Sequence, residues 1–130
     1  MKRQSVISTS IFSALVFILM IFFFHPQVSY ANAPQDVKIE YDSGSQTLAV
    51  TITHKSPFPS FHHIKTVEIK KNSAVINTVK YDTQPDKSPF IYTYKVEAIQ
   101  GDKLEVTAIC NLSGSKTATI TVSPAANAGK

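Results

Sequence analysis

The sequence contains little cysteine and arginine, and each shortage excludes a class of protein or bond. Its single cysteine, Cys110, excludes an intramolecular disulfide. Its single arginine, Arg3, leaves the rest of the chain without the guanidinium forks that nucleic-acid surfaces favour, so we expect no nucleic-acid partner. There is also no Gly-x-Ser-x-Gly motif, and a serine hydrolase of that type is therefore excluded.

The N-terminus has the pattern of a signal peptide, predicted over residues 1–31. Lys2 and Arg3 form a short positive region before a nearly unbroken apolar run at residues 11–24. That run is fourteen residues long, whereas a membrane span needs ~20, so cleavage is favoured over a permanent anchor.

Two small-residue frames fit a cleavage site, one between residues 31 and 32 and the other between 33 and 34. We prefer the first, because a proline directly after the cut makes a poor peptidase substrate. No cysteine lies nearby, which excludes a lipoprotein anchor. The protein is predicted to be periplasmic or secreted. The alternative is anchoring in the inner membrane by an uncleaved leader, the one case in which we expect membrane contact.

The remaining chain is long enough for one small domain, predicted over residues 32–123, with a disordered tail at 124–130. Without Lys2 and Arg3 it has eleven lysines against nine acids, a net charge of about +2. This weak and scattered charge does not indicate an electrostatic binding surface.

Short β-branched and aromatic runs separated by turn residues predict an all-β fold. Seven such runs in about a hundred residues indicate an immunoglobulin-like antiparallel β-sandwich. No stretch of ten or more residues in the chain after the leader has a helical period. The predicted strands are 37–41, 47–53, 63–70, 74–81, 90–96, 103–110 and 116–122.

An exported protein meets an oxidising compartment, so its unpaired thiol calls for an explanation. Cys110 shares a strand face with Leu104 and Val106 and is predicted to point inward. His54 and His62 bound a proline-containing loop, and they can meet Cys110 if the sixth strand returns beside the third. Two imidazoles and a thiolate form a metal-ligand set, so His54, His62 and Cys110 are the candidate metal ligands.

Other residues near this set have structural interpretations. Phe58 and Phe61 are expected to pack onto the core, and His63 to face solvent or lie behind the ligands. Cys110 could instead be a small buried hydrophobic residue, and the two histidines could be ordinary loop residues.

The order of these residues resembles the iron-binding domain of desulfoferrodoxin and the neelaredoxins, the superoxide reductases. The resemblance covers roughly residues 54–122 and is carried by His54, His62-His63-Ile64, Val67-Glu68-Ile69 and Cys110-Asn111-Leu112-Ser113-Gly114. It implies an immunoglobulin-like fold, an iron cofactor, equatorial ligation by His54 and His62, and axial ligation by Cys110. It also implies an oxidoreductase that takes electrons from a periplasmic donor.

The chain departs from that family at two ligands. Ser113 stands at the place of the third histidine, and residues 32–53 contain no histidine to serve as the fourth. At most three of the five family ligands remain. The sequence therefore predicts a degenerate superoxide-reductase-type site and leaves catalysis undecided.

A second resemblance is to the immunoglobulin-like subunit of the periplasmic sulfur-oxidation carrier complex. It is carried by the His-x-Ile strand and by residues 72–75, 88–90 and 101–106. It implies the alternative function, a non-catalytic protein-binding module with a periplasmic protein partner.

Overall fold

A computed structural model describes residues 32–124, which form seven β-strands. The predicted leader and nearly all of the predicted tail lie outside these residues. Every predicted strand is found, with each end within one residue of its predicted place. The strands are β1 (Asp36–Asp42), β2 (Thr47–Thr53), β3 (Ile64–Lys71), β4 (Ala74–Lys80), β5 (Phe90–Lys95), β6 (Lys103–Cys110) and β7 (Ser115–Thr121).

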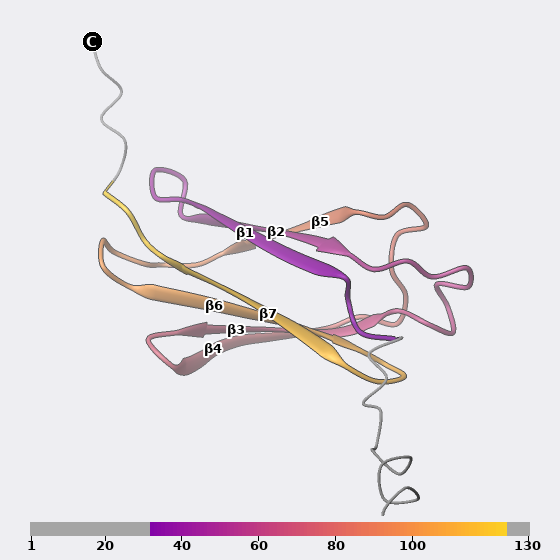
Figure 1. The fold of residues 1–130 in the computed structure, drawn as a ribbon. Coiled ribbons are helices and arrows are strands. Elements are labelled where there is room, and N and C mark those ends of the chain that lie inside the picture. The colour runs from indigo at the N-terminus through magenta and orange to yellow at the C-terminus, as the bar shows by residue number, and fades with distance from the viewer. Residues whose placement is uncertain (1–31, 125–130) are drawn as a thin grey trace, which may run out of the picture.

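The strands form two antiparallel sheets that lie face to face (Figure 1). One sheet has the order β1-β2-β5 and the other β4-β3-β6-β7. In immunoglobulin lettering these are A-B-E and C′-C-F-G, so the predicted immunoglobulin-like sandwich is confirmed. In the described residues no helix is long and apolar enough to span a membrane.

The core lies between the sheets and follows from strict alternation along the strands. In β2 the buried residues are Leu48, Val50 and Ile52, and each is fully buried. Burying such side chains stabilises the fold by about 1.5 to 3 kcal/mol apiece. The other strands contribute inward residues in the same way, among them Ile39, Ile64, Val67, Ile69, Phe90, Tyr94, Leu104, Val106 and Ala108.

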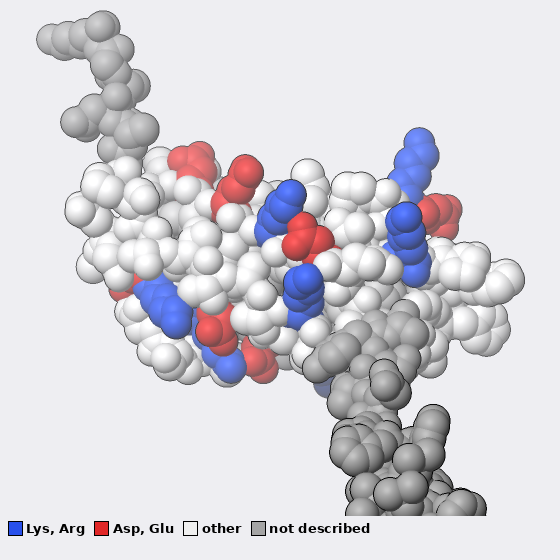
Figure 2. Space-filling model, viewed as in Figure 1, with Lys and Arg blue, Asp and Glu red and all other residues white. Residues whose placement is uncertain are grey.

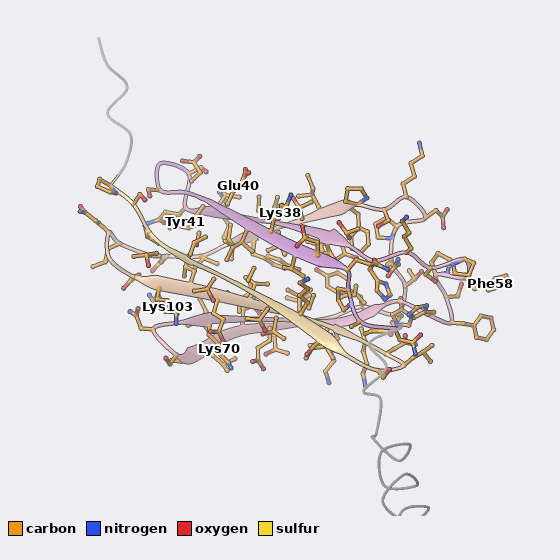
Figure 3. The ribbon with its side chains drawn as sticks, viewed as in Figure 1. Lys38, Glu40, Tyr41, Phe58, Lys70 and Lys103 are labelled. Atoms are coloured by element: carbon orange, nitrogen blue, oxygen red, sulfur yellow. The ribbon has the colours of Figure 1, made fainter. Side chains whose placement is uncertain are left out.

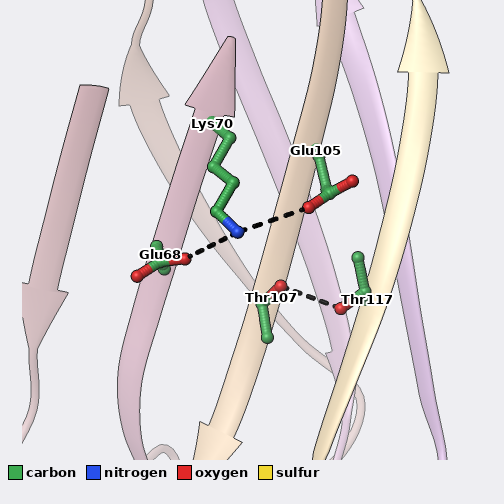
Figure 4. A network of polar contacts seen from close by, with 5 residues as sticks. All are labelled: Glu68, Lys70, Glu105, Thr107 and Thr117. Carbon is green, nitrogen blue, oxygen red and sulfur yellow. Dashed lines mark hydrogen bonds and ion pairs between the residues drawn. The ribbon is translucent and has the colours of Figure 1, made fainter. Parts of the chain in front are cut away.

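Polar side chains cover the outer face of the four-stranded sheet. Lys70 lies between Glu68 and Glu105, at 3.3 and 3.7 Å, and Thr107 and Thr117 share a hydroxyl hydrogen bond of 2.8 Å (Figure 4). Acidic and basic side chains are interspersed on the face seen in Figure 2 rather than gathered by sign. Ion pairs that are about a third exposed add little stability, so the sandwich depends on its apolar core.

Sheet register brings the chemistry-bearing residues to one end of the sandwich. Asp36 pairs with Thr53 at that end of one sheet, and Ile64 pairs with Cys110 at that end of the other. The return of β6 beside β3, on which the predicted convergence depended, is therefore confirmed.

Candidate metal centre

His54 lies one residue beyond the end of β2, and its side chain points inward like those of the buried residues in that strand. It follows Thr53 directly and continues the buried series after Ile52, so its side chain is only 1% exposed. Its backbone N–H donates to Ser88 Oγ at 3.0 Å, which holds the chain where the strand ends. A histidine buried this deeply needs partners for both ring nitrogens.

Cys110 is the last residue of β6 and points into the sandwich, as predicted. It is 5% exposed and belongs to the buried series of Leu104, Val106 and Ala108. Its thiol lies 3.8 Å from Asn111 Oδ1, which is a weak contact for sulfur.

His62 comes from the loop between β2 and β3, and Asn111 fixes its position. The Asn111 side chain donates to the Phe61 carbonyl at 2.7 Å and accepts from the His63 N–H at 2.9 Å. The Asn111 N–H also donates to the His63 carbonyl at 3.0 Å. These bonds lie on both sides of His62. Because Asn111 directly follows Cys110, they hold the His62 imidazole beside the Cys110 thiol.

His54, His62 and Cys110 form one group, here called the His–His–Cys cluster. Their ligand atoms all lie within 4.8 Å of one another, and the two rings meet edge to face with centroids 4.6 Å apart. Atoms that share one metal ion lie roughly 3 to 4 Å apart. A contraction of about 1 Å would therefore bring the cluster to ligating distance.

Gln84 determines which nitrogen of a neutral His54 ring carries the proton. Its amide donates to the His54 carbonyl at 2.8 Å, and its oxygen accepts from the Ile64 N–H at 3.0 Å. These two bonds fix the amide orientation, so the same oxygen, 2.6 Å from His54 Nδ1, must accept a proton from that nitrogen. In the neutral ring the lone pair is then on Nε2. Ring orientation by an outer hydrogen-bond partner is typical of metal-ligating histidines.

The donor groups of the cluster fit a transition-metal ion. Nε2 of His62 is buried, and within residues 32–124 it has no hydrogen-bond partner. An orphaned buried nitrogen is costly unless something binds it. Together with His54 Nε2 and the thiolate form of Cys110, it makes a set that suits iron, zinc or copper.

Two expectations about neighbouring residues are wrong. Phe58 is 68% exposed and Phe61 78%, so neither packs onto the core, and Phe58 projects outward from the end of the molecule (Figure 3). Their loop is held instead by backbone bonds and by Asn111, which leaves the rings in solvent. His63 was expected to face solvent or to lie behind the ligands, and its exposure of 8% excludes the first of these places. Strand alternation fails at His63 because β3 begins at Ile64 and its register shifts before Thr66.

Gln84 and Asn111 were not predicted as site residues. Each acts across a long stretch of chain, 30 residues from Gln84 to His54 and 50 from Asn111 to Phe61. Both sit in loops rich in turn residues, where a polar amide ordinarily faces water. The one local signal is that Asn111 directly follows Cys110.

No protein-family model matches the chain, and no curated protein is significantly similar to it. Solved structures of superoxide reductases are similar to it. The superoxide reductase (1Fe-SOR) from Giardia intestinalis is 15% identical over 70% of this chain and 97% of its own, with a TM-score of 0.45. The superoxide reductase from Nanoarchaeum equitans is 18% identical over 74% and 96%, with a TM-score of 0.44.

Fibronectin(III)-like modules of Clostridium thermocellum CbhA are also similar, at 21% identity over 70% of this chain and 100% of theirs, with a TM-score of 0.36. None of these TM-scores reaches 0.5, and the similarities establish no site and no function.

Proposed function

We propose that the chain binds one transition-metal ion through His54, His62 and Cys110. One observation carries this proposal. The buried Nε2 of His62 has no hydrogen-bond partner, and it lies beside His54, whose Nδ1 is bonded to Gln84. An ion would be held by two neutral imidazoles and a thiolate. Gln84 would orient the His54 ring by accepting from its Nδ1, and Asn111 would fix the backbone on both sides of His62.

Iron is the ion that the sequence resemblance implies, and it is the first to test. Bound iron would supply one-electron chemistry between its ferrous and ferric states. Three protein ligands leave coordination positions for a small oxidant or for water. The burial of His54 and Cys110 would keep bulk water away from that side of the ion.

The test uses residues 32–130, because all seven strands and the core lie inside that range. The protein is loaded anaerobically with ferrous iron, beside Cys110→Ser and Ala108→Ser. Ala108 is a buried neighbour on the same face of β6, so its variant adds a core hydroxyl without removing the thiol. We expect one equivalent of iron and a thiolate charge-transfer band that Cys110→Ser alone abolishes. Protein that stays metal-free with ferrous iron and with zinc would contradict the proposal.

Export is part of the same proposal, supported by the leader pattern of residues 1–31. N-terminal sequencing of protein recovered from the periplasm should begin at Asn32 or Pro34. An intact leader on membrane-bound protein would favour the anchored alternative.

The alternative function, a protein-binding module, is favoured by one observation. β4 is an edge strand, and its Val75 and Ile76 are 53% and 43% exposed. Exposed edges can accept an added strand from another chain. Val75→Lys should then abolish capture of a periplasmic partner and leave metal content unchanged. Unaltered capture would count against β4 as the contact.

A further inference from the structure

The first described residues, 32–35, run across the end of the sandwich that holds the His–His–Cys cluster, and are here called the N-terminal strap. Gln35 anchors them. Its N–H donates to the Thr53 carbonyl at 2.8 Å, its side-chain oxygen accepts from the Lys55 N–H at 3.1 Å, and its carbonyl accepts from Lys116 Nζ at 2.7 Å. These bonds tie the strap to both sheets.

The strap also seats against the turn that follows Cys110. Ala33 is 8% exposed, and a Cβ placed on Gly114 would lie 2.6 Å from the Ala33 Cβ. Gly114 has a φ of +85°, a conformation that favours glycine. Asn32 Nδ2 adds a long hydrogen bond of 3.3 Å to Ser113 Oγ. Both the conformation and the close approach therefore call for glycine at position 114.

The strap brings a backbone carbonyl to the metal-facing nitrogen of His54. The Asn32 oxygen lies 3.1 Å from His54 Nε2. Because Gln84 takes the proton of Nδ1, the neutral ring presents a lone pair there, and two acceptors face each other. Either a second ring proton or a cation removes the conflict, and the cation is favoured because the unpartnered Nε2 of His62 lies in the same cluster.

We propose that the Asn32 carbonyl oxygen is a fourth donor to the metal ion, an inference that rests on the proposed function. Two ligands about 2.1 Å from one ion and at right angles to each other lie about 3.0 Å apart, close to the observed 3.1 Å. An oxygen donor also shifts the set away from soft cuprous copper and toward ferrous iron.

The two cleavage positions then produce different sites. Cleavage between residues 31 and 32 retains the Asn32 carbonyl, whereas cleavage between 33 and 34 removes it together with Ala33. The place of processing would determine whether the ion has three or four protein donors.

The test compares chains 32–130 and 34–130, both acetylated at the N-terminus so that no free amine acts as a donor. Ferrous iron affinity is measured anaerobically, and cobalt(II) absorption reports the coordination number. We expect chain 34–130 to bind ferrous iron about tenfold more weakly or worse, a loss at least as large as that of an outer-shell partner. Its cobalt spectrum should also change.

Two variants of chain 32–130 separate ligation from folding. Gly114→Ala displaces the strap without shortening it and should weaken binding in the same direction. It also strains the turn whose carbonyl bonds the Cys110 N–H, so a loss counts for ligation only together with that of chain 34–130. Ser113→Ala removes only the Asn32 side-chain bond and should leave affinity within twofold. Urea unfolding of each metal-free protein verifies that the sandwich is intact.

The outcomes distinguish the two proposals. If chain 34–130 and Gly114→Ala bind iron within twofold of chain 32–130, while Cys110→Ser abolishes binding, the carbonyl is not a donor and the His–His–Cys site stands. If chain 32–130 binds no metal, the proposed function fails and the fourth donor fails with it.

Discussion

Replacing Gln84 with alanine tests the arrangement of the site most directly. The side chain serves three buried groups, the His54 carbonyl, the Ile64 N–H and His54 Nδ1, at 2.8, 3.0 and 2.6 Å. A buried polar group left without a partner costs about 1 to 3 kcal/mol. The site lies at an end of the sandwich, where water can enter the vacated space. We therefore take the lower limit for each group and expect a loss of about 3 kcal/mol in the free energy of unfolding.

The assay is urea unfolding of the metal-free protein, with Gln100→Ala as the matched control. Gln100 is exposed in the turn before β6, and its truncation should change stability by less than about 0.5 kcal/mol. Metal affinity is measured on the same proteins. Without Gln84 the ring of His54 is free to rotate and exchange tautomers, and we expect a loss of about 10- to 100-fold. A stability loss below about 1 kcal/mol would refute the claim that Gln84 serves all three groups.

Three further predictions concern Asn111, the apolar core and Tyr92. Asn111→Ala frees the backbone on both sides of His62 and should weaken metal binding about tenfold; an unchanged affinity by titration calorimetry would show that the loop holds itself. Leu104→Ala, at a fully buried position, should cost about 2 to 5 kcal/mol in urea, whereas Leu112→Ala at a position 58% exposed should cost less than about 0.5. Burial, with a smaller contribution from a neighbouring tyrosine, raises the pKa of Tyr92 to about 12. Its contribution to stability should be present below pH ~10, where an unfolded tyrosine titrates, and be lost between about pH 10 and 12; Tyr92→Phe should flatten that loss.

The sequence predicts the strands well because the signal for each is local. Alternation along β2 and β6 places Ile52 and Cys110 inward without knowledge of any partner strand. The same alternation explains why convergence of His54, His62 and Cys110 could be proposed from strand ends alone.

The sequence does not predict what depends on distant contacts. The Gln84 amide and the Asn32 carbonyl act on His54 across 30 and 22 residues, and neither position has a local motif. Any residue can supply a backbone carbonyl, so the residue type at position 32 does not indicate a donor. Phe58 and Phe61 were assigned to the core on hydrophobicity alone, which does not determine the path of a proline-containing loop.

The position of the cluster also bears on how the two sheets are joined. In antibody domains a disulfide links strands B and F across the sandwich. β2 and β6 hold those places here, and the ligands His54 and Cys110 stand at their ends. They are 56 residues apart in the chain (110 minus 54), and a covalent cross-link over such a loop constrains the unfolded chain by about 4 kcal/mol. A chain with one cysteine cannot form that disulfide, so under the proposed function coordination would replace it, and resistance to unfolding would follow the supply of metal.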